Sequence, residues 1–477
     1  RPIYPFHKKN FAPRASMAYS PNTDSKFTRF LFGGPGKTSI RAGWGMYYDL
    51  IGQPVASTYE ANAFGFRQSF NNPSAQQTFV TAPRFSGFNS LPAALVRPAP
   101  RGGFPATPPN NFAITASIDD ALQNPYVFRQ NFSIGREFKD GLFIELSYVG
   151  SLSRKSLVNR DLAMPTNLTD PKSGQDYFTA ATQMVLYRRA GLNGTNMPAI
   201  PFFENIYGNF AGSGRTATQN VFQNVFRFYN TNDFVSVLAD IDHFCDPSCG
   251  TLGANAQFNP QFSALSGWSS IAQGNYHAMQ GTLRKRFNSD LVADFNWTWS
   301  KSIDMASRAE NQGSFSGFLQ NPFKGSQRRA VSDYDQRHIY NAFVVYNLPF
   351  GRGKKFGGSV NRALDTLIGG WTASPTFQMS TELPTNVFAT GVWPTNWNIT
   401  SSAVPKVGGP APVPDKTANT SLPPNMFANP DAAWNYFDYS LPGESGPRNI
   451  LRQDGLFNIN MALAKRCLLY TSPSPRD

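Results

Sequence analysis

The feature that most constrains this chain is an alternation of apolar and polar residues that recurs along its length. In one segment the apolar members are Ile40, Ala42, Trp44, Met46 and Tyr48, and the residues between them include Ser39, Arg41, Gly43 and Gly45. A period of two residues is that of a β-strand, whose side chains point alternately to opposite faces of a sheet. Each segment is about 9–12 residues, the length that a tilted strand needs to cross a bilayer, whereas strands of soluble sandwiches average about 5–6.

Further segments have the same alternation and place charged and amide side chains on the second face. They are residues 11–19, 128–138, 142–148, 291–299, 340–348, 371–379 and 457–463. A sheet packed on a dry core does not place Arg, Glu, Asp and Asn inward, but a sheet between lipid and a wet lumen does. The sequence therefore predicts an all-β protein, a transmembrane antiparallel β-barrel, of which the chain shows about nine strands.

Short and long connections alternate between these segments. Lys139–Gly141 and Asn288–Asp290 are tight turns, and 21–37 and 349–369 are connectors of medium length. The long polar stretches are residues 50–125, 151–275, 301–335 and 381–454. Short turns at one end and long loops at the other are typical of outer-membrane barrels, whose turns are periplasmic and whose loops are extracellular.

Aromatic residues gather near the loop-side ends of the segments. We interpret six of them as membrane-interface aromatics: Trp44, Tyr48, Tyr148, Trp297, Trp299 and Trp371. Amphipathic rings prefer the level of the lipid headgroups, which gives barrels their aromatic girdles. The alternative is that these rings fill the core of a soluble β protein.

The composition excludes several other classes of protein. The 477 residues contain no run of about 18 apolar residues, so no membrane-spanning helix is predicted. The net charge of +13 could indicate nucleic acid, but the cations are scattered, with Arg129, Arg136, Arg284 and Arg286 inside predicted strands. We therefore predict no nucleic-acid partner and expect outer-membrane lipid, with lipopolysaccharide phosphates meeting cations at the rim.

Few residues of the sequence suggest a disulfide, a metal site or a catalytic site. Cys245 and Cys249 lie in a predicted extracellular loop, where a small disulfide is favoured over two free thiols, and over a metal site for which only His243 is near. The four histidines have no nucleophile or carboxylate at a catalytic spacing, so we predict no enzyme activity, no cofactor and no metal. Asp333, Asp335, Arg337 and His338 are expected to form a hydrogen-bonded polar cluster where a strand begins.

Several stretches of the chain together resemble the barrel of TonB-dependent outer-membrane transporters, and within them the Oar-like group. The stretches are Asn10–Pro21, Lys37–Asp49, Gln130–Phe138, Leu146–Ser151, Asn275–Phe287, Asp333–His338 and Leu348–Gly353. The resemblance implies a barrel of about 22 strands with a plugged lumen. Residues 1–466 would then be a partial barrel domain, with the plug, the TonB-contacting segment and the first strands upstream, and 467–477 are interpreted as a tail derived from a sequencing adapter.

The resemblance also implies a function. The chain is predicted to be a receptor and transporter for TonB-dependent uptake of an unidentified ligand, in the outer membrane of a Gram-negative bacterium. Loops 50–125 and 151–275 are the candidates for ligand capture, because they are long and rich in aromatic residues and Asn. Two alternatives remain: a passive porin-like or structural outer-membrane barrel, and a secreted β-rich adhesin or glycan-binding protein.

Overall fold

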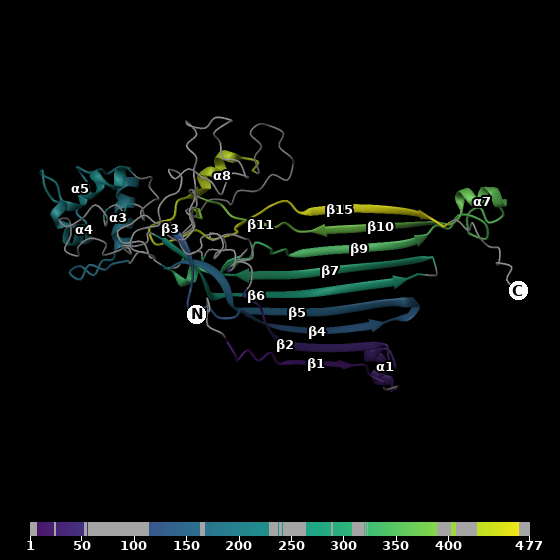
Figure 1. Ribbon diagram of the computed structural model, residues 1–477. Coiled ribbons are helices and arrows are strands. Elements are labelled where there is room, and N and C mark those ends of the chain that lie inside the picture. The colour runs from purple at the N-terminus through teal and green to yellow at the C-terminus, as the bar shows by residue number, and fades with distance from the viewer. Residues whose placement is uncertain are drawn as a thin grey trace, which may run out of the picture.

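A single curved sheet dominates the computed structural model of the chain, with most helices at one end of its strands (Figure 1). The structure describes residues 7–22, 25–51, 55, 114–162, 167–228, 237, 241, 264–287, 290–307, 319, 321, 323–388, 402–406 and 427–466. No helix in these ranges is both long enough and apolar enough to cross a membrane.

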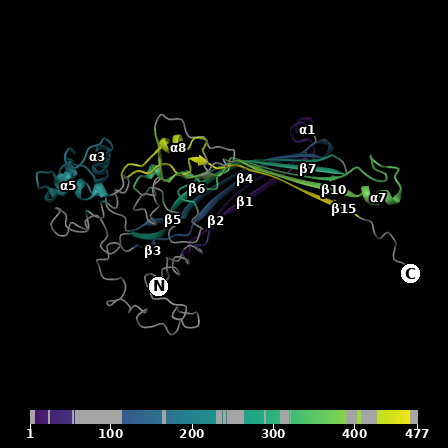
Figure 2. The same ribbon diagram turned by 90° about the horizontal axis from the view of Figure 1, so that it is seen from above.

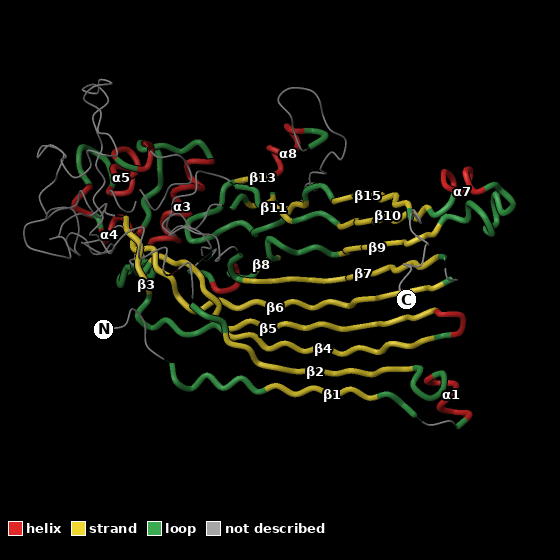
Figure 3. The backbone as a smooth tube through the Cα atoms, turned by 45° about the vertical axis from the view of Figure 1, so that its right-hand side comes forward, coloured by secondary structure: helices red, strands yellow, loops and turns green. Residues whose placement is uncertain are grey.

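The sheet has eleven strands, and nine of them follow one another in a continuous antiparallel path (Figure 3). The nine are β1 (Arg14–Tyr19), β2 (Thr38–Tyr48), β4 (Tyr126–Glu137), β5 (Leu142–Asp161), β6 (Ala264–Arg286), β7 (Leu291–Asp304), β9 (His338–Asn347), β10 (Trp371–Ser380) and β15 (Leu456–Lys465). Off this path, β3 (Ile114–Ile118) pairs in parallel with β6, and β8 (Ala330–Val331) pairs with β7. The expected partial barrel of about nine antiparallel strands is confirmed, and the sheet is open, with β1 and β15 at its edges.

The tight turn between β4 and β5 forms where the sequence predicts it. A 3₁₀ turn, η5 (Lys139–Gly141), joins the strands, and Asp140 and Gly141 both have left-handed backbone conformations, with φ of 59° and 69°. Asp and Gly tolerate positive φ better than bulky or β-branched residues do, so this pair can reverse the chain within a few residues. Of the second predicted turn, only Asp290 lies within the described residues.

One face of the sheet is largely apolar, and its few polar side chains include Gln130 and Arg136. Strand register places Ala42, Phe132, Tyr148, Met279 and Trp299 in one row across five strands. These side chains are not covered by a second layer, and 50% of Trp299 is exposed, as is 71% of Met461 in β15. So wide an apolar surface is costly in water, and hydrocarbon removes that cost. We call this surface the outer face.

The opposite face is polar and is held by side-chain hydrogen bonds. Arg284 Nε donates to Asp294 Oδ2 at 2.7 Å, and Asn296 Nδ2 donates to Asp294 Oδ1 at 2.5 Å. Thr282 Oγ1 donates to Asn296 Oδ1 at 2.8 Å. This arrangement fits a water-filled or protein-filled lumen, and we call this surface the inner face.

Strands β5 and β6 are longer than the alternation predicts. The sequence places a loop at 151–275, whereas β5 continues to Asp161 and β6 begins at Ala264. The pairing register shifts between Ser153 and Ser156 and again before Val158, which marks a bulge. A bulge changes which face a side chain occupies, so it hides the continuing strand from a period-two analysis.

Within the same stretch, residues 167–228 fold into helices rather than a structureless loop. The helices are α3 (Tyr177–Arg189), α4 (Pro201–Ile206), η6 (Gly208–Phe210), α5 (Ala217–Asn224) and η7 (Phe226–Phe228). Their largest fully buried side chains are Tyr177, Met184, Met197, Ile200, Phe202 and Phe203. We call this unit the helical loop unit; among the described residues it contains the largest buried apolar cluster.

The two ends of the strands differ, as predicted from the connections. The helical loop unit lies at one end, and α1 (Lys26–Phe32) and α7 (Arg362–Ile368) lie at the other (Figures 1 and 2). The remaining elements are η8 (Gly325–Gln327), β11 (Pro384–Thr385), β12 (Val404–Pro405), α8 (Pro430–Tyr436), β13 (Phe437–Asp438) and β14 (Leu451–Arg452). The ends are called the loop end and the turn end below.

Candidate functional site: a hollow at the loop end

A hollow of about 430 Å³ opens where three connections meet at the loop end. Its walls come from the helical loop unit and from two connections that are far away in sequence, before β9 and before β15. The lining residues are Asn167, Asp176, Phe178, Thr179, Thr182, Gln183, Phe323, Lys324, Leu441, Pro442, Gly443 and Glu444. We call it the loop hollow.

An aromatic pair forms one wall of the loop hollow. The rings of Phe178 and Phe323 meet edge to face, with centroids 4.8 Å apart and planes at 78°. Gly443 lies against Phe178 with φ of +78°, and a Cβ there would come within 2.8 Å of the Phe178 ring. A glycine is therefore required for the 441–444 segment to close on this ring.

Polar groups on α3 line the loop hollow beside Phe178, which belongs to the same helix. Asp176 caps the helix by accepting a hydrogen bond from Thr179 N at 2.7 Å, so its carboxylate is partly engaged. Within the described part of the chain, the Thr182 hydroxyl and the Gln183 amide make no hydrogen bond, and both remain available to a ligand. Lys324 and Glu444 form an ion pair at 2.5 Å across the rim.

A buried carboxylate fixes the segment that leads from the loop hollow into β15. Asp335 is fully buried and accepts hydrogen bonds from Arg452 Nη2 and Ser302 N, both at 2.7 Å. Arg337 Nε lies 3.6 Å from the same carboxylate. The expected cluster of Asp333, Asp335 and Arg337 thus gains a partner from a segment 117 residues further along the chain.

The other members of that cluster behave differently. Asp333 accepts a hydrogen bond from Asn449 Nδ2 at 2.8 Å, and Arg448 bonds to Asp304 at the end of β7. His338 lies outside this network, because its Nδ1 accepts a hydrogen bond from Trp297 Nε1 at 3.2 Å. Together these bonds pin the 448–452 segment to the loop ends of β7 and β9.

Asp170 organises the entrance to α3. Its buried carboxylate accepts hydrogen bonds from Ser173 Oγ, Asn205 Nδ2 and the backbone N–H groups of Lys172 and Ser173. Burial raises the pKa of this carboxyl, but the hydrogen bonds from Ser173, Asn205 and the backbone outweigh burial and lower the pKa to about 2. The group supports the wall of the loop hollow rather than lining it.

The six aromatics predicted at the membrane interface occupy different levels. Trp44, Tyr48 and Trp299 lie in the loop-end halves of β2 and β7, and Trp297 lies at the middle of β7; 43% of Trp44 and 50% of Trp299 is exposed. Tyr148 is not at a strand end, because β5 continues to Asp161. Trp371 begins β10 at the turn end. Their interface role stays a prediction.

Other sequence predictions fall partly outside the described residues. Cys245, Cys249 and His243 lie outside them, as do 467–477 and most of 50–125. Among the described residues, no three His, Cys, Asp or Glu side chains group closely enough to hold a metal ion. Of the strand arginines, Arg129, Arg284 and Arg286 are on the inner face by register, and Arg136 is on the outer face at the turn end.

Sequence reasoning missed the loop hollow because its walls come from three remote segments. One sequence signal for a helix in this region was the spacing of Thr216 and Gln219, which form a capping box at the start of α5. The long-range partners of Asp335 and Phe178 had no signal in a single sequence.

Comparisons with known proteins agree with this architecture. A family model described as an outer membrane beta barrel domain matches residues 1–473. No curated protein matches the chain.

Two solved structures are similar to the chain at low identity. One is the outer membrane transporter YddB from Escherichia coli, with a TM-score of 0.34 and 7% identity over 90% of this chain and 32% of that one. The other is a mutant of the ferric enterobactin receptor PfeA from Pseudomonas aeruginosa, with a TM-score of 0.30 and 8% identity over 80% of this chain and 30% of that one. The chain thus spans about a third of the length of each.

The family model covers nearly the whole chain, and the described strands form an open antiparallel sheet with one apolar and one polar face. The chain therefore belongs to the outer-membrane β-barrel family, and its place is the outer membrane of a Gram-negative bacterium.

Proposed function

We propose that the chain is the barrel part of a receptor that takes up an extracellular ligand by TonB-dependent transport, and that the loop hollow captures this ligand. The observation that carries the proposal is the combination of an aromatic pair with unengaged polar groups on α3 at the loop end. In this orientation the loop hollow faces the medium outside the cell.

The lining of the loop hollow favours a particular class of ligand. The Phe178–Phe323 pair supplies an apolar aromatic surface, and Thr182 and Gln183, on the same helix as Phe178, supply uncharged hydrogen-bonding groups beside it. The charges of Lys324 and Glu444 neutralise each other at the rim. A small uncharged ligand with one apolar side, such as a sugar or a peptide segment, matches this arrangement.

Apolar residues on the inner face favour a plugged lumen over an open pore. By register Phe343 and Val345 of β9 lie on the inner face beside Asp294 and Val292, and 43% and 39% of their surfaces are exposed. In a water-filled porin this apolar patch would be exposed to water, which is unfavourable, whereas protein inside the lumen would cover it. TonB is then the partner that acts through the plug, and no residue of the chain needs to make or break a covalent bond.

The proposal is tested by uptake in a Gram-negative host that expresses the complete gene. The probes are a fluorescein-labelled oligosaccharide mixture and a fluorescein-labelled peptide mixture. One of them should accumulate only when TonB and the proton-motive force are both present. A triple substitution, T179A/T182A/Q183A, should abolish accumulation, and Leu186→Ala, on the same helix but outside the hollow, should leave it unchanged.

The rival function is a passive barrel. In that case the probe would equilibrate across the membrane without TonB and would never exceed its external concentration. The secreted adhesin considered from the sequence does not agree with membership of the outer-membrane family.

A further inference from the structure

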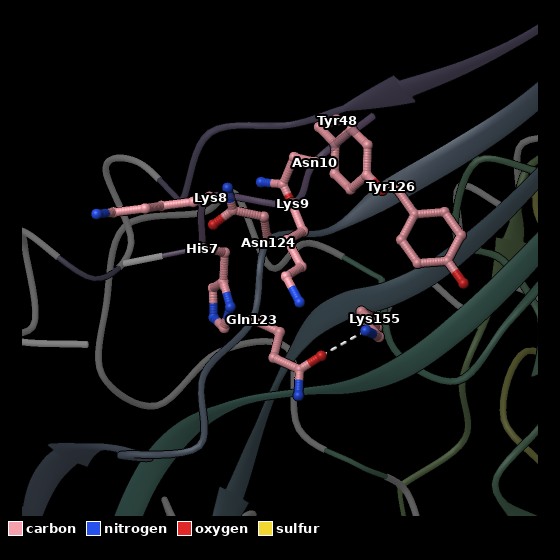
Figure 4. Close-up of a pocket in the computed structure, with 9 residues that line it drawn as sticks. All are labelled: His7, Lys8, Lys9, Asn10, Tyr48, Gln123, Asn124, Tyr126 and Lys155. Carbon is pink, nitrogen blue, oxygen red and sulfur yellow. Dashed lines mark hydrogen bonds between the residues drawn. The ribbon is translucent and has the colours of Figure 1, made fainter. Parts of the chain in front are cut away.

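A second pocket, of about 490 Å³, lies at the loop end near the N-terminus of the chain. It is formed by the segment before β1, the end of β2, the start of β4 and the bulge of β5 (Figure 4). Lys8, Lys9 and Lys155 line it together with Tyr48, Tyr126 and Gln123. We call it the lysine pocket; it shares no lining residue with the loop hollow.

The two tyrosines place the lysine pocket at the edge of the outer face. Tyr48 pairs with Tyr126 across β2 and β4, and their rings lie 5.7 Å apart. Tyr126 also meets Phe128, the next outer-face residue of β4, edge to face at 5.4 Å. The tyrosines thus continue the apolar surface up to its loop-end limit, where an amphipathic ring reaches the lipid headgroups.

The bulge of β5 directs a third cation to the same place. Lys155 has a left-handed conformation, with φ of 53°, within the first shift of register in β5, between Ser153 and Ser156. Its ammonium lies 5.8 Å from the centre of the Tyr126 ring and donates a hydrogen bond to Gln123 Oε1, as the dashed line in Figure 4 marks. A non-glycine residue with positive φ is uncommon, and it persists where the surrounding structure holds it.

Among the residues that the structure describes, no carboxylate compensates the charge of the lysine pocket. None of its lining residues is a carboxylate. Lys8 and Lys9 are exposed and form no ion pair within the described part of the chain. Further along β5, Arg160 does have an acidic partner, since its Nη2 bonds to Asp119 Oδ2 at 3.0 Å. Burial raises the pKa of Asp119, but hydrogen bonds from Ser269, the Ala121 backbone and Arg160 lower it below its usual value.

The lysine pocket combines three lysines and two tyrosines at the loop-end limit of the outer face. This combination suits a phosphate group attached to a lipid. A phosphate group accepts hydrogen bonds from several ammonium groups, which serve as point charges. A soluble phosphate would gain nothing from the adjoining apolar surface, whereas the acyl chains of a lipid would lie along Phe128 and its neighbours.

We propose that the lysine pocket binds the phosphate of an anionic outer-leaflet lipid, with Lys8, Lys9 and Lys155 on the phosphate and the acyl chains on the outer face. This inference is independent of uptake, because it concerns the lipid-facing side of the sheet and not the loop hollow.

The test measures binding of bis-phosphorylated lipid A in mixed micelles to the full chain by microscale thermophoresis. The variant K8Q/K9Q/K155Q should bind on the order of 100-fold more weakly, since each lysine near an anionic lipid surface contributes roughly fivefold. The matched control K26Q/K139Q/K355Q removes the same charge at the turn end and should bind like the native chain. A K8R/K9R/K155R variant should retain binding, and this separates charge from fold.

Three outcomes would overturn the proposal. One is equal affinity of the native chain and K8Q/K9Q/K155Q. Another is equal affinity for lipid A that lacks phosphate. The last is displacement of the lipid by inorganic phosphate at concentrations similar to that of the lipid, which would assign the pocket to a soluble anion instead.

Discussion

At the scale of single residues, buried carboxylates at the loop end act as fixed points for long connections. Asp335 is the clearest of them, because it is fully buried and its strongest partner, Arg452, comes from a different connection. Removing one partner of a buried pair leaves the other charge in a poorly solvated site, and this costs more than the pair itself contributes.

We therefore expect Arg452→Ala to destabilise the chain by about 3 kcal/mol. The remaining contacts of Asp335, to Arg337 and to Ser302 N, would not replace the lost ion pair. The measurement is the urea midpoint of the chain in detergent, followed by tryptophan fluorescence. Arg362→Ala, at an exposed position of α7, is the control and should leave the midpoint unchanged. Equal urea midpoints for the two variants would contradict a stabilising role for the Asp335–Arg452 ion pair.

Asp170 makes the helical loop unit sensitive to acid. Its pKa in the folded chain, about 2, is below the ordinary value of 3.8, so its stabilising contribution is complete above pH 4 and is lost as the pH falls toward 2. A shift of this size corresponds to about 2.5 kcal/mol. Pepsin should thus begin to cut within 167–228 over this pH range.

A pair of Asp→Asn variants separates this effect from general acid unfolding. Asp170→Asn should make the helical loop unit cleavable already at pH 4 and should flatten the dependence on pH. Asp431→Asn, at an exposed site in α8, should behave like the native chain. Cleavage of 167–228 that does not change between pH 4 and pH 2 would show that Asp170 is not the controlling group.

At the scale of elements, α1 carries apolar side chains that no other part of the described chain covers. Phe27, Phe30 and Leu31 lie on one side of this short helix, and 70% and 79% of the two phenylalanines is exposed. Arg136 and Thr38, both on the outer face, donate hydrogen bonds to the carbonyls of Leu31 and Phe32 at 2.9 and 2.7 Å. These bonds attach α1 to the lipid-facing side of the turn end.

We expect α1 to lie in the membrane interface. A bimane label on Phe30→Cys, in a chain without other cysteines, should be quenched by brominated lipids in reconstituted membranes, because the apolar side of an amphipathic helix enters the headgroup boundary. The same label on Arg29→Cys, on the opposite side of α1, should be quenched much less. Equal quenching of the two labels would contradict an interfacial orientation.

The sequence was sufficient to predict the strands whose alternation is uninterrupted, such as β2, β4 and β10, and the turn at Lys139–Gly141. It failed for the loop-end half of β5, because the bulge near Lys155 breaks the period of two. It also missed α3, although the buried residues Tyr177, Ala181, Met184 and Val185 have the i, i+4, i+7, i+8 spacing of a helix. The bulge could not be predicted from local pattern, whereas the spacing in α3 was a signal that a period-two analysis does not detect.

The candidate site was less predictable than the fold for a related reason. The stretch 151–275, which is predicted from the sequence as a candidate for ligand capture, supplies one wall of the loop hollow, and the hollow is complete only with Phe323 and Gly443, which lie beyond that stretch in sequence. Likewise the partners of Asp335 and Asp304 are arginines of the 448–452 segment. A single sequence carries no record of such remote pairs.

At the scale of the whole molecule, the sheet is a part of a cylinder, and among the described strands β1 and β15 are each paired on one side only. Exposed edges of this length would be covered in a closed barrel, and the apolar patch of Phe343 and Val345 would meet protein in the lumen.

We expect Val345→Cys to react quickly with a water-soluble maleimide in this chain and slowly in the product of the complete gene. Ser133→Cys, on the inner face far from the patch, measures general access to the lumen. Equal rates at position 345 in both proteins would argue for an open pore.

The central claim is that one face of the sheet meets hydrocarbon and the other meets water or protein in the lumen. Spin labels at Asn131, Phe132, Ser133 and Ile134 of β4, in the chain reconstituted into lipid bilayers, test it most directly. Labels at 132 and 134 should collide mainly with oxygen dissolved in the bilayer, and labels at 131 and 133 mainly with a water-soluble nickel chelate. Four labels with the same accessibility profile would contradict the account.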